Sequence, residues 1–206
     1  MSGSAAHREC IVLSPAGAVW DQRSLLLLHG RGDTARAFIA HWRPLVDEGW
    51  TLIAPLSSQA CATGGFCWDD AELALREIRG HLDDCRRLRG IDVGGMVIAG
   101  ASQGARLALE LATEAGLPAL CAFPSFPAGY DLSRLTSMPG RVPVGFILGD
   151  LDESRDHVRQ VIAALESAGV PIVIREMPGV GHDPSEGFAS IARAMLARLV
   201  DAAAST

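Results

Sequence analysis

A serine, an acid and a histidine occur at positions in this sequence from which they could act together on a carbonyl group. Ser102 lies in the pentapeptide GASQG (residues 100–104), between an apolar run and a helical pattern. A strand, turn and helix with small residues at the turn lift a serine hydroxyl clear of a sheet. That hydroxyl is a weak nucleophile at neutral pH, so it needs an imidazole to remove its proton and a carboxylate to orient the imidazole.

Candidates for these two partners follow later in the chain. His182, in the loop after the last predicted strand, is the candidate base. Asp150 and Asp152 both follow the preceding predicted strand, whereas Asp156 falls inside a predicted helix. We favour Asp152 over Asp150, because Asp152 occupies a loop position from which a side chain can reach a neighbouring strand end. The resulting order of serine, acid and histidine is the one found in α/β-hydrolase folds.

Two backbone N–H groups could stabilise the negative charge that develops on the attacked oxygen. The residue after the nucleophile, Gln103, supplies one of them, because the turn already directs its N–H to that position. We expect the second from Arg31, in the loop after the first buried strand, where Gly30 and Gly32 allow the backbone to approach the site closely.

The remaining histidines have plainer interpretations. His29 adjoins the expected oxyanion loop, and we expect a structural hydrogen bond there. His81 and His157 lie within predicted helices and are expected on the surface, while His7 and His41 are expected to be solvated.

Strand patterns alternate with helix patterns along the whole chain, which predicts a mostly parallel sheet of about six to seven strands, with helices on both faces and no large cap. The buried strands are predicted at residues 24–28, 50–54, 96–99, 119–123, 142–148 and 170–176, with a short strand near 9–13. The helices are predicted at residues 35–48, 68–88, 103–115, 155–168 and 188–200. The tail, residues 202–206, is expected to fray.

The segment 57–67 is the longest irregular stretch in this prediction. Aromatic residues near it and after the strand at 119–123 could flank the ends of the strands and hold the substrate. The candidate substrate-binding residues are Phe66, Trp68, Phe123, Phe126 and Tyr130.

Composition narrows the class of protein. A chain of 206 residues with 49% hydrophobic residues predicts one domain, residues 1–206. A net charge of −6, without a basic stripe, argues against nucleic-acid binding. With no signal peptide and no membrane-spanning run, we expect a cytoplasmic protein. The five cysteines are expected to be free thiols, and the gap between Cys61 and Cys67 fits no metal motif, so no metal is expected.

At the candidate site the chain resembles the small α/β-hydrolases of the phospholipase/carboxylesterase family, which includes acyl-protein thioesterases. The segments that carry the resemblance are LLLLHGRGDT (25–34), IAPLSSQ (53–59), CWDD (67–70), IAGASQGARLALELA (98–112), ILGDLDE (147–153) and PGVGHDPSEGF (178–188). The resemblance implies a cofactor-free hydrolase that cleaves esters or thioesters through an acyl-enzyme. It also implies Asp152 as the acid, in Gly149-x-x-Asp152, and His182 as the histidine.

Several alternatives stay open at this point. The substrate could be a carboxylic ester or an acyl thioester, and the scaffold could bind a ligand without turning it over, because a fold does not fix a function. A third possibility is a hydrolase of a dienelactone or of a peptide bond. Serine rather than cysteine at the turn argues against the dienelactone, and no peptide-binding groove is indicated. Apolar residues within 122–132 could serve a homodimer as readily as a small-molecule substrate.

Overall fold

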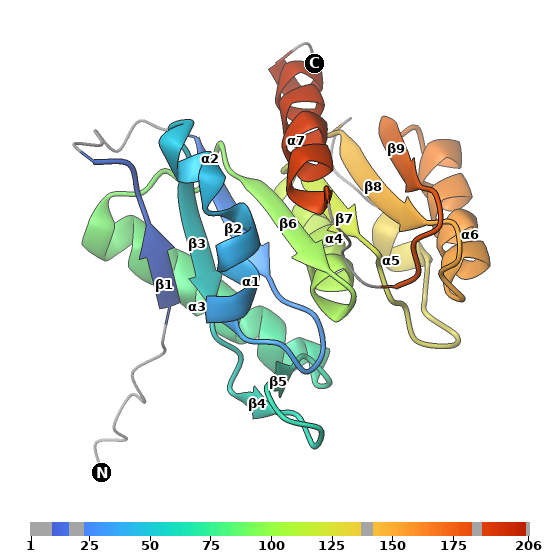
Figure 1. The fold of residues 1–206 in the computed structure, drawn as a ribbon, viewed down its shortest axis with the longest axis horizontal. Helices are drawn as coiled ribbons and strands as arrows, with labels where there is room; N and C mark the ends of the chain where they lie inside the picture. Colours follow the sequence, from blue (N-terminus) through green and yellow to red (C-terminus); the bar gives the residue numbers. More distant parts are fainter. Residues whose placement is uncertain (1–9, 17–22, 137–141, 183–186, 205–206) are drawn as a thin grey trace.

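The central sheet has seven strands, of which all but one run parallel to their neighbours. A computed structural model describes residues 10–16, 23–136, 142–182 and 187–204. In that part of the chain the strand order is β1-β3-β2-β6-β7-β8-β9 (Figure 1). The strands are β1 (Cys10–Leu13), β2 (Ser24–Leu28), β3 (Thr51–Pro55), β6 (Val97–Ala101), β7 (Ala119–Ala122), β8 (Val144–Gly149) and β9 (Ile172–Met177). The edge strand β1 alone pairs antiparallel, with β3. The predicted fold class is therefore confirmed.

Helices cover both faces of this sheet. They are α1 (Ala35–Trp42), α2 (Pro44–Asp47), α3 (Ala71–Arg89), α4 (Gln103–Ala115), α5 (Ser133–Thr136), α6 (Arg155–Ser167) and α7 (Phe188–Ala204). Successive side chains of a strand point to opposite faces. Leu25 and Leu27 of β2 accordingly pack in the core cluster that contains α1 and α7. Leu26 and Leu28 pack in the cluster that contains α3, α4 and α6. In Figure 1, α1 and α7 lie in front of the sheet, with α3 and α4 behind it.

The predicted helix over residues 35–48 is two helices in the structure. Thr34 caps α1, its hydroxyl accepting a hydrogen bond from the Ala37 N–H at 3.1 Å. The break comes at Pro44, which begins α2. Proline has no N–H to donate to Ala40, and the N–H of Arg43 bonds to that carbonyl instead. The prediction of one continuous helix was therefore wrong.

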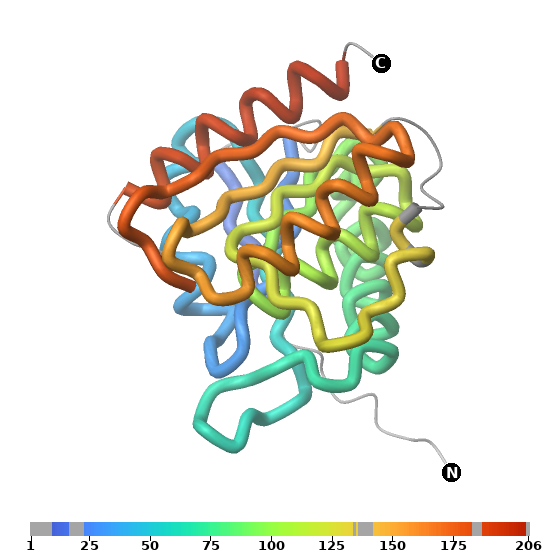
Figure 2. Tube along the Cα trace, turned by 90° about the vertical axis from the view of Figure 1, so that its right-hand side faces the viewer, coloured from blue at the N-terminus to red at the C-terminus, as the bar shows by residue number. Residues whose placement is uncertain are grey.

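The segment predicted to be irregular, 57–67, contains a short hairpin of β4 (Gln59–Ala60) and β5 (Phe66–Cys67). This hairpin projects beyond the main body at the bottom of Figure 2. An antiparallel bridge between Asp33 and Phe66 ties it to the loop that follows β2. The hairpin therefore packs beside one of the loops expected to form the site.

The long helix α3 buries one face against the sheet. Its buried positions Ala74, Ile78, His81 and Cys85 recur at intervals of three or four residues, so they share one face of the helix. His81 is therefore buried rather than on the surface, where it was expected, whereas Leu88 near the end of the helix is 68% exposed. At the C-terminus, α7 runs to Ala204, so residues 202–204 are helical rather than frayed.

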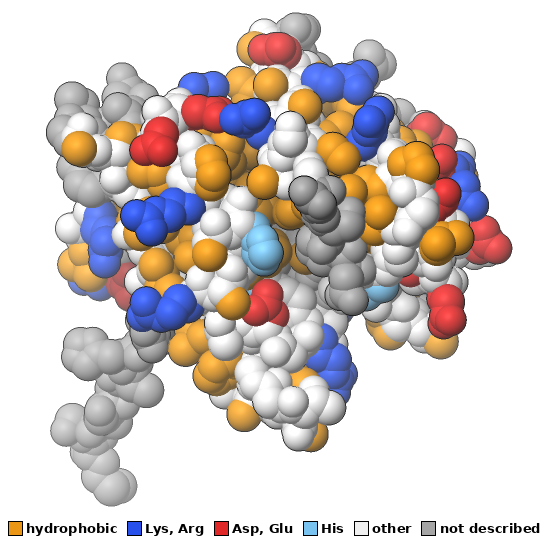
Figure 3. Space-filling model, in the orientation of Figure 1, with side chains coloured by type: hydrophobic (Ala, Val, Ile, Leu, Met, Phe, Trp, Pro, Cys, Tyr) orange, Lys and Arg blue, Asp and Glu red, His pale blue; other side chains and the backbone are white. Residues whose placement is uncertain are grey.

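Other expectations concern thiols, surface charge and membranes. The five cysteines are free, as predicted, and all but Cys10 are buried. On the face shown in Figure 3, basic side chains form separate groups among acidic and apolar ones. None of the described helices combines the length and the apolar character needed to cross a membrane.

Candidate active site

Ser102 occupies a sharp turn between β6 and α4. Its φ of 53° is positive, a conformation that a residue with a side chain seldom adopts. Neighbouring strand ends hold the turn in place: the Ser102 N–H donates to the Ala122 carbonyl at 3.0 Å, and the Ser102 carbonyl accepts from Ser125 N–H at 3.2 Å. The turn therefore has the geometry that the GASQG sequence predicted.

Two glycines allow the start of α4 to lie close to the backbone of β2 and β6. A Cβ on Gly100 would lie 2.2 Å from the Gly104 carbonyl oxygen, and a Cβ on Gly104 would lie 2.1 Å from the Leu28 carbonyl oxygen. Both contacts are with backbone atoms, which cannot rotate away as a side-chain tip can. Only glycine fits where α4 begins against β2 and β6.

Gly104→Ala is therefore expected to destabilise the fold, lowering the free energy of unfolding by about 3 kcal/mol or more. The matched control is Gly181→Ala, where the new Cβ meets nothing within 4 Å, so a change within about 1 kcal/mol is expected. Urea unfolding followed by circular dichroism measures both. Equal stabilities of the two variants would contradict this account of the turn.

Ser102, His182 and Asp152 come together at the carboxyl ends of β6, β9 and β8. His182 Nε2 lies 2.9 Å from Ser102 Oγ, and His182 Nδ1 lies 2.8 Å from Asp152 Oδ2. The carboxylate is buried, with 6% of its side chain exposed, whereas the imidazole is 40% exposed. One ring nitrogen of His182 thus faces the serine hydroxyl and the other faces a buried acid.

Asp152 is held from the side opposite His182. Its Oδ1 accepts hydrogen bonds from the backbone N–H of Ser154 at 2.8 Å and from the Ser154 hydroxyl at 2.7 Å. Burial by itself raises the pKa of this carboxyl, but the bonds from Ser154 and from His182 outweigh it, so the pKa is lowered from its usual value. At neutral pH Asp152 is therefore a carboxylate.

The other aspartate in this loop has a different contact. Asp150 Oδ1 accepts a hydrogen bond from the Gly179 N–H at 2.7 Å, across to the loop after β9. The Leu151 N–H donates to the Val180 carbonyl at 3.0 Å in the same region. Of the two aspartates, Asp152 contacts the histidine, and Asp150 joins the two loops that bring the histidine and Asp152 together.

The two predicted N–H donors flank Ser102. Gln103 is the first residue of α4, so its N–H has no acceptor within the helix. Arg31 lies in the turn after β2, where a Cβ built on Gly30 would come within 3.4 Å of Ser102 Cβ. Among the described residues, no main-chain carbonyl accepts a hydrogen bond from either N–H.

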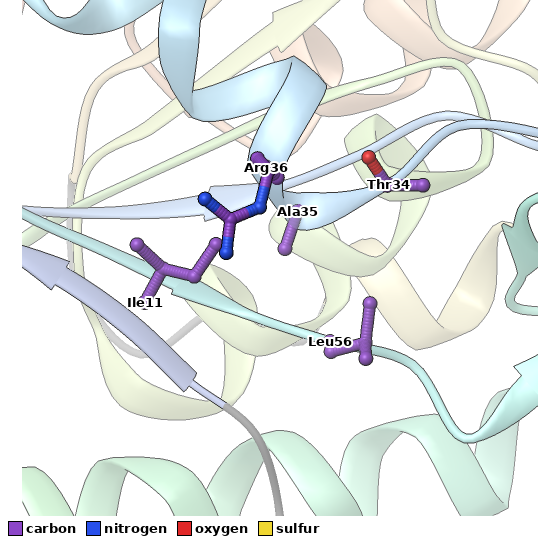
Figure 4. A pocket seen from close by; sticks show the side chains of 5 residues that line it. All are labelled: Ile11, Thr34, Ala35, Arg36 and Leu56. Atoms are coloured by element: carbon purple, nitrogen blue, oxygen red, sulfur yellow. The ribbon is translucent and has the colours of Figure 1, made fainter.

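A cavity of about 290 Å³ opens beside the serine and the histidine. It is lined by Gly30, Arg31, Gly32, Asp33, Phe38, His41, Ala101, Ser102 and His182. A second cavity, of about 220 Å³, lies between β1 and the start of α1, with Ile11, Thr34, Ala35, Arg36 and Leu56 around it (Figure 4). None of the candidate catalytic residues or expected oxyanion donors lines the second cavity.

The five aromatic candidates do not line the cavity beside Ser102. Trp68 and Phe123 are 0% and 1% exposed because they pack in the two core clusters, which corrects the expectation for these two. Phe126 packs against Tyr130, whose hydroxyl donates to Glu110 at 2.8 Å. For Phe66, Phe126 and Tyr130, a role in substrate binding stays a prediction.

Similar architectures occur among solved structures. Esterase PE8 superposes with a TM-score of 0.76 at 21% identity, over 93% of this chain and 99% of its own. A carboxylesterase from Bacillus cereus superposes with a TM-score of 0.71 at 21% identity, over 97% of this chain and 96% of its own. An uncharacterized protein from the same species superposes with a TM-score of 0.77 at 20% identity, over 88% of this chain and 60% of its own. The chain has the α/β-hydrolase fold.

Comparison of the sequence with family models and with curated proteins found no match. At these levels of identity, the structural similarity establishes the α/β-hydrolase fold and no more. Among the described residues there is also no group of three or more His, Cys, Asp or Glu side chains that could hold a metal ion.

Sequence reasoning missed some residues at this α/β-hydrolase site. Phe38 and His41 of α1 line the cavity, although neither was a candidate for substrate binding; His41 is exposed, as expected, and Phe38 is buried. The available signal was their spacing of three residues on a helix that directly follows the loop where the second oxyanion donor is expected. His29 is fully buried, and its Nδ1 lies 2.9 Å from the Gly30 carbonyl oxygen, consistent with the expected structural role.

Proposed function

We propose that this chain is a serine hydrolase that cleaves carboxylic esters through an acyl-enzyme on Ser102. The observation that carries the proposal is the continuous path from the buried Asp152 carboxylate through both nitrogens of His182 to the Ser102 hydroxyl. Esterase PE8 and the Bacillus cereus carboxylesterase, which share the fold, support an ester as the substrate.

The first half of the proposed reaction forms the acyl-enzyme. Ser102 Oγ attacks the ester carbonyl carbon while His182 Nε2 takes the hydroxyl proton, and Asp152 stabilises the imidazolium through Nδ1–H. The carbonyl oxygen becomes an oxyanion that accepts hydrogen bonds from the N–H groups of Arg31 and Gln103. The intermediate then collapses, and the leaving alcohol receives the proton from His182.

The second half repeats these roles with water. His182 removes a proton from a water molecule, whose oxygen attacks the acyl carbon on Ser102. Collapse of the second tetrahedral intermediate returns the proton to Ser102 Oγ and releases the acid. No step needs a metal or cofactor, because the nucleophile, base and oxyanion donors are all supplied by the chain. A thioester would follow the same steps with a thiol as the leaving group.

A fluorophosphonate probe tests whether the serine is activated. Ser102 Oγ is expected to attack the phosphorus and displace fluoride, so that the intact protein gains the mass of one probe less hydrogen fluoride. Peptide mass spectrometry should place the adduct on Ser102, and the Ser102→Ala protein should stay unlabelled. A folded protein that does not react would instead favour a ligand-binding protein on the same scaffold.

A further inference from the structure

Asp69 connects the two residues that are proposed to supply the oxyanion donors. Its Oδ1 accepts a hydrogen bond from Arg31 Nη1 at 2.7 Å and another from Gln103 Nε2 at 2.8 Å. Arg31 belongs to the loop after β2, and Gln103 opens α4. These segments are 72 residues apart in the chain, from position 31 to position 103, and a single carboxylate oxygen joins their side chains.

The backbone that carries Asp69 is itself fixed to the same site. The Trp68 N–H donates to Gln103 Oε1 at 3.0 Å, so both ends of the Gln103 amide are held. The Trp68 indole is fully buried and donates from Nε1 to the His29 carbonyl at 2.8 Å. The hydrogen bonds of Trp68 therefore fix the backbone next to Asp69, independently of the contacts that the Asp69 side chain makes.

A second connection runs through the hairpin. The Gly32 N–H donates to the Phe66 carbonyl at 2.8 Å, and the Phe66 N–H donates to the Asp33 carbonyl at 2.9 Å. Residues 66–69 thus contact the loop after β2 through backbone bonds at one end and through the Asp69 carboxylate at the other. One attachment holds the Arg31 side chain, and the other holds Gly32 and Asp33, the two residues that follow it.

The Asp69–Arg31 pair is poorly placed to stabilise the fold. Its side chains are 48% and 53% exposed, and exposed ion pairs contribute little to stability because water screens them. The hydrogen bond from Gln103 is the main cause that lowers the pKa of Asp69 from its usual value; burial opposes it, and a hydrogen bond with Cys67 and the charge of Arg31 lower the pKa further, so the acceptor is charged at neutral pH. Charge-assisted hydrogen bonds are short and directional, and they fix geometry.

We propose that Asp69 is a positioning residue for the oxyanion hole: by holding the side chains of Arg31 and Gln103 on one oxygen, it sets the separation and direction of their main-chain N–H groups. This role rests on the proposed function. The carboxylate touches no reacting atom and acts through the two residues that it joins.

The test compares Asp69→Ala with Asp69→Asn. Alanine removes the shared acceptor, and kcat for p-nitrophenyl acetate is expected to fall about tenfold with little change in KM. That is less than the 10²- to 10³-fold that loss of a whole oxyanion donor costs, since both N–H groups remain but are less well placed. Asparagine keeps an oxygen that can accept the same two bonds, and it should restore most of the activity.

Inhibition by a trifluoromethyl ketone provides a readout that a merely structural role would not change. This compound forms a tetrahedral oxyanion on Ser102, so its Ki should rise in Asp69→Ala by the same factor as kcat falls. The KM for the ester should stay nearly unchanged. The control is Asp83→Ala, which removes an exposed ion pair of the same type, Asp83 with Arg86 at 3.1 Å on α3. It should change none of these values.

The possible outcomes separate this proposal from the proposed function. Wild-type turnover and fluorophosphonate labelling, with unchanged kcat and Ki in Asp69→Ala, would overturn the role of Asp69 and leave the hydrolase standing. Equal losses in the alanine and asparagine variants, together with a lowered Tm in both, would overturn it in favour of a structural role. A wild-type protein that neither turns over esters nor reacts with the probe would overturn both.

Discussion

Replacing Ser102 with alanine is expected to remove almost all ester hydrolysis while leaving the fold intact. Loss of the nucleophile in a serine triad costs about 10⁶-fold in kcat, as much as loss of all three residues, and the oxyanion hole alone leaves a small residue of activity. The turn should survive, because its backbone bonds to Ala122 and Ser125 do not involve the hydroxyl. Alanine meets the same strain at φ 53° as serine does.

The measurement is initial-rate hydrolysis of p-nitrophenyl esters and matched thioesters of graded acyl length, with Ser102→Ala as the blank. Ser167→Ala is the matched control, because Ser167 is an exposed serine on α6 whose hydroxyl donates a hydrogen bond to the Ala163 carbonyl at 2.8 Å. That variant should keep wild-type rates across the series. Substantial turnover by a folded Ser102→Ala protein would show that another group performs the chemistry, and the proposed mechanism would have to be abandoned.

Asp152→Asn is expected to lower kcat by about 10⁴-fold with little loss of stability. Asparagine has nearly the same shape, but it can present its amide group to His182 Nδ1 and so favour the tautomer with the proton on Nε2. In that tautomer Nε2 cannot accept the Ser102 proton. The neutral side chain also leaves the developing imidazolium without its counter-charge.

Asp150→Asn is the matched comparison, two residues away in the same loop. Its side-chain oxygen can still accept the hydrogen bond that Asp150 now takes from Gly179 N–H at 2.7 Å, so kcat should stay within a few-fold of wild type. Steady-state kinetics and thermal unfolding of both variants decide the assignment. If Asp150→Asn were the inactive variant, the acid would have been misassigned.

Local pattern was enough to predict most of the fold. The run of four leucines in β2 indicated a strand buried on both faces, and the alternation of strands and helices indicated a parallel sheet covered on both sides. The predictions of individual elements were wrong where a single residue or a tertiary contact decided the structure. Pro44 divided one predicted helix, and the segment predicted to be irregular forms a hairpin of β4 and β5, which a bridge between Asp33 and Phe66 ties to the loop after β2.

The positions of the candidate catalytic residues could also be predicted, because parallel strands deliver their carboxyl ends to one edge of the sheet. Residues that follow β6, β8 and β9 can therefore meet there, so the predicted strands, together with the motif at residues 100–104, were enough to name Ser102, Asp152 and His182 as candidates. The pattern favoured Asp152 over Asp150 by position, whereas the hydrogen bonds that Asp152 accepts from Ser154 and from His182 depend on how two loops cross. Side-chain direction within a loop has no periodic signal.

The sequence by itself determined the turn at Ser102, because a Cβ at position 100 or 104 would collide with backbone atoms. Glycine is therefore required at both positions. Only the tertiary structure decided the surroundings of that turn. It buried Trp68 and Phe123, lined the cavity with Phe38 and His41, and brought Asp69 to Arg31 and Gln103. Turn geometry is a local property of a few neighbouring residues, whereas a pocket is formed by side chains from distant segments, whose meeting depends on the packing of the whole domain.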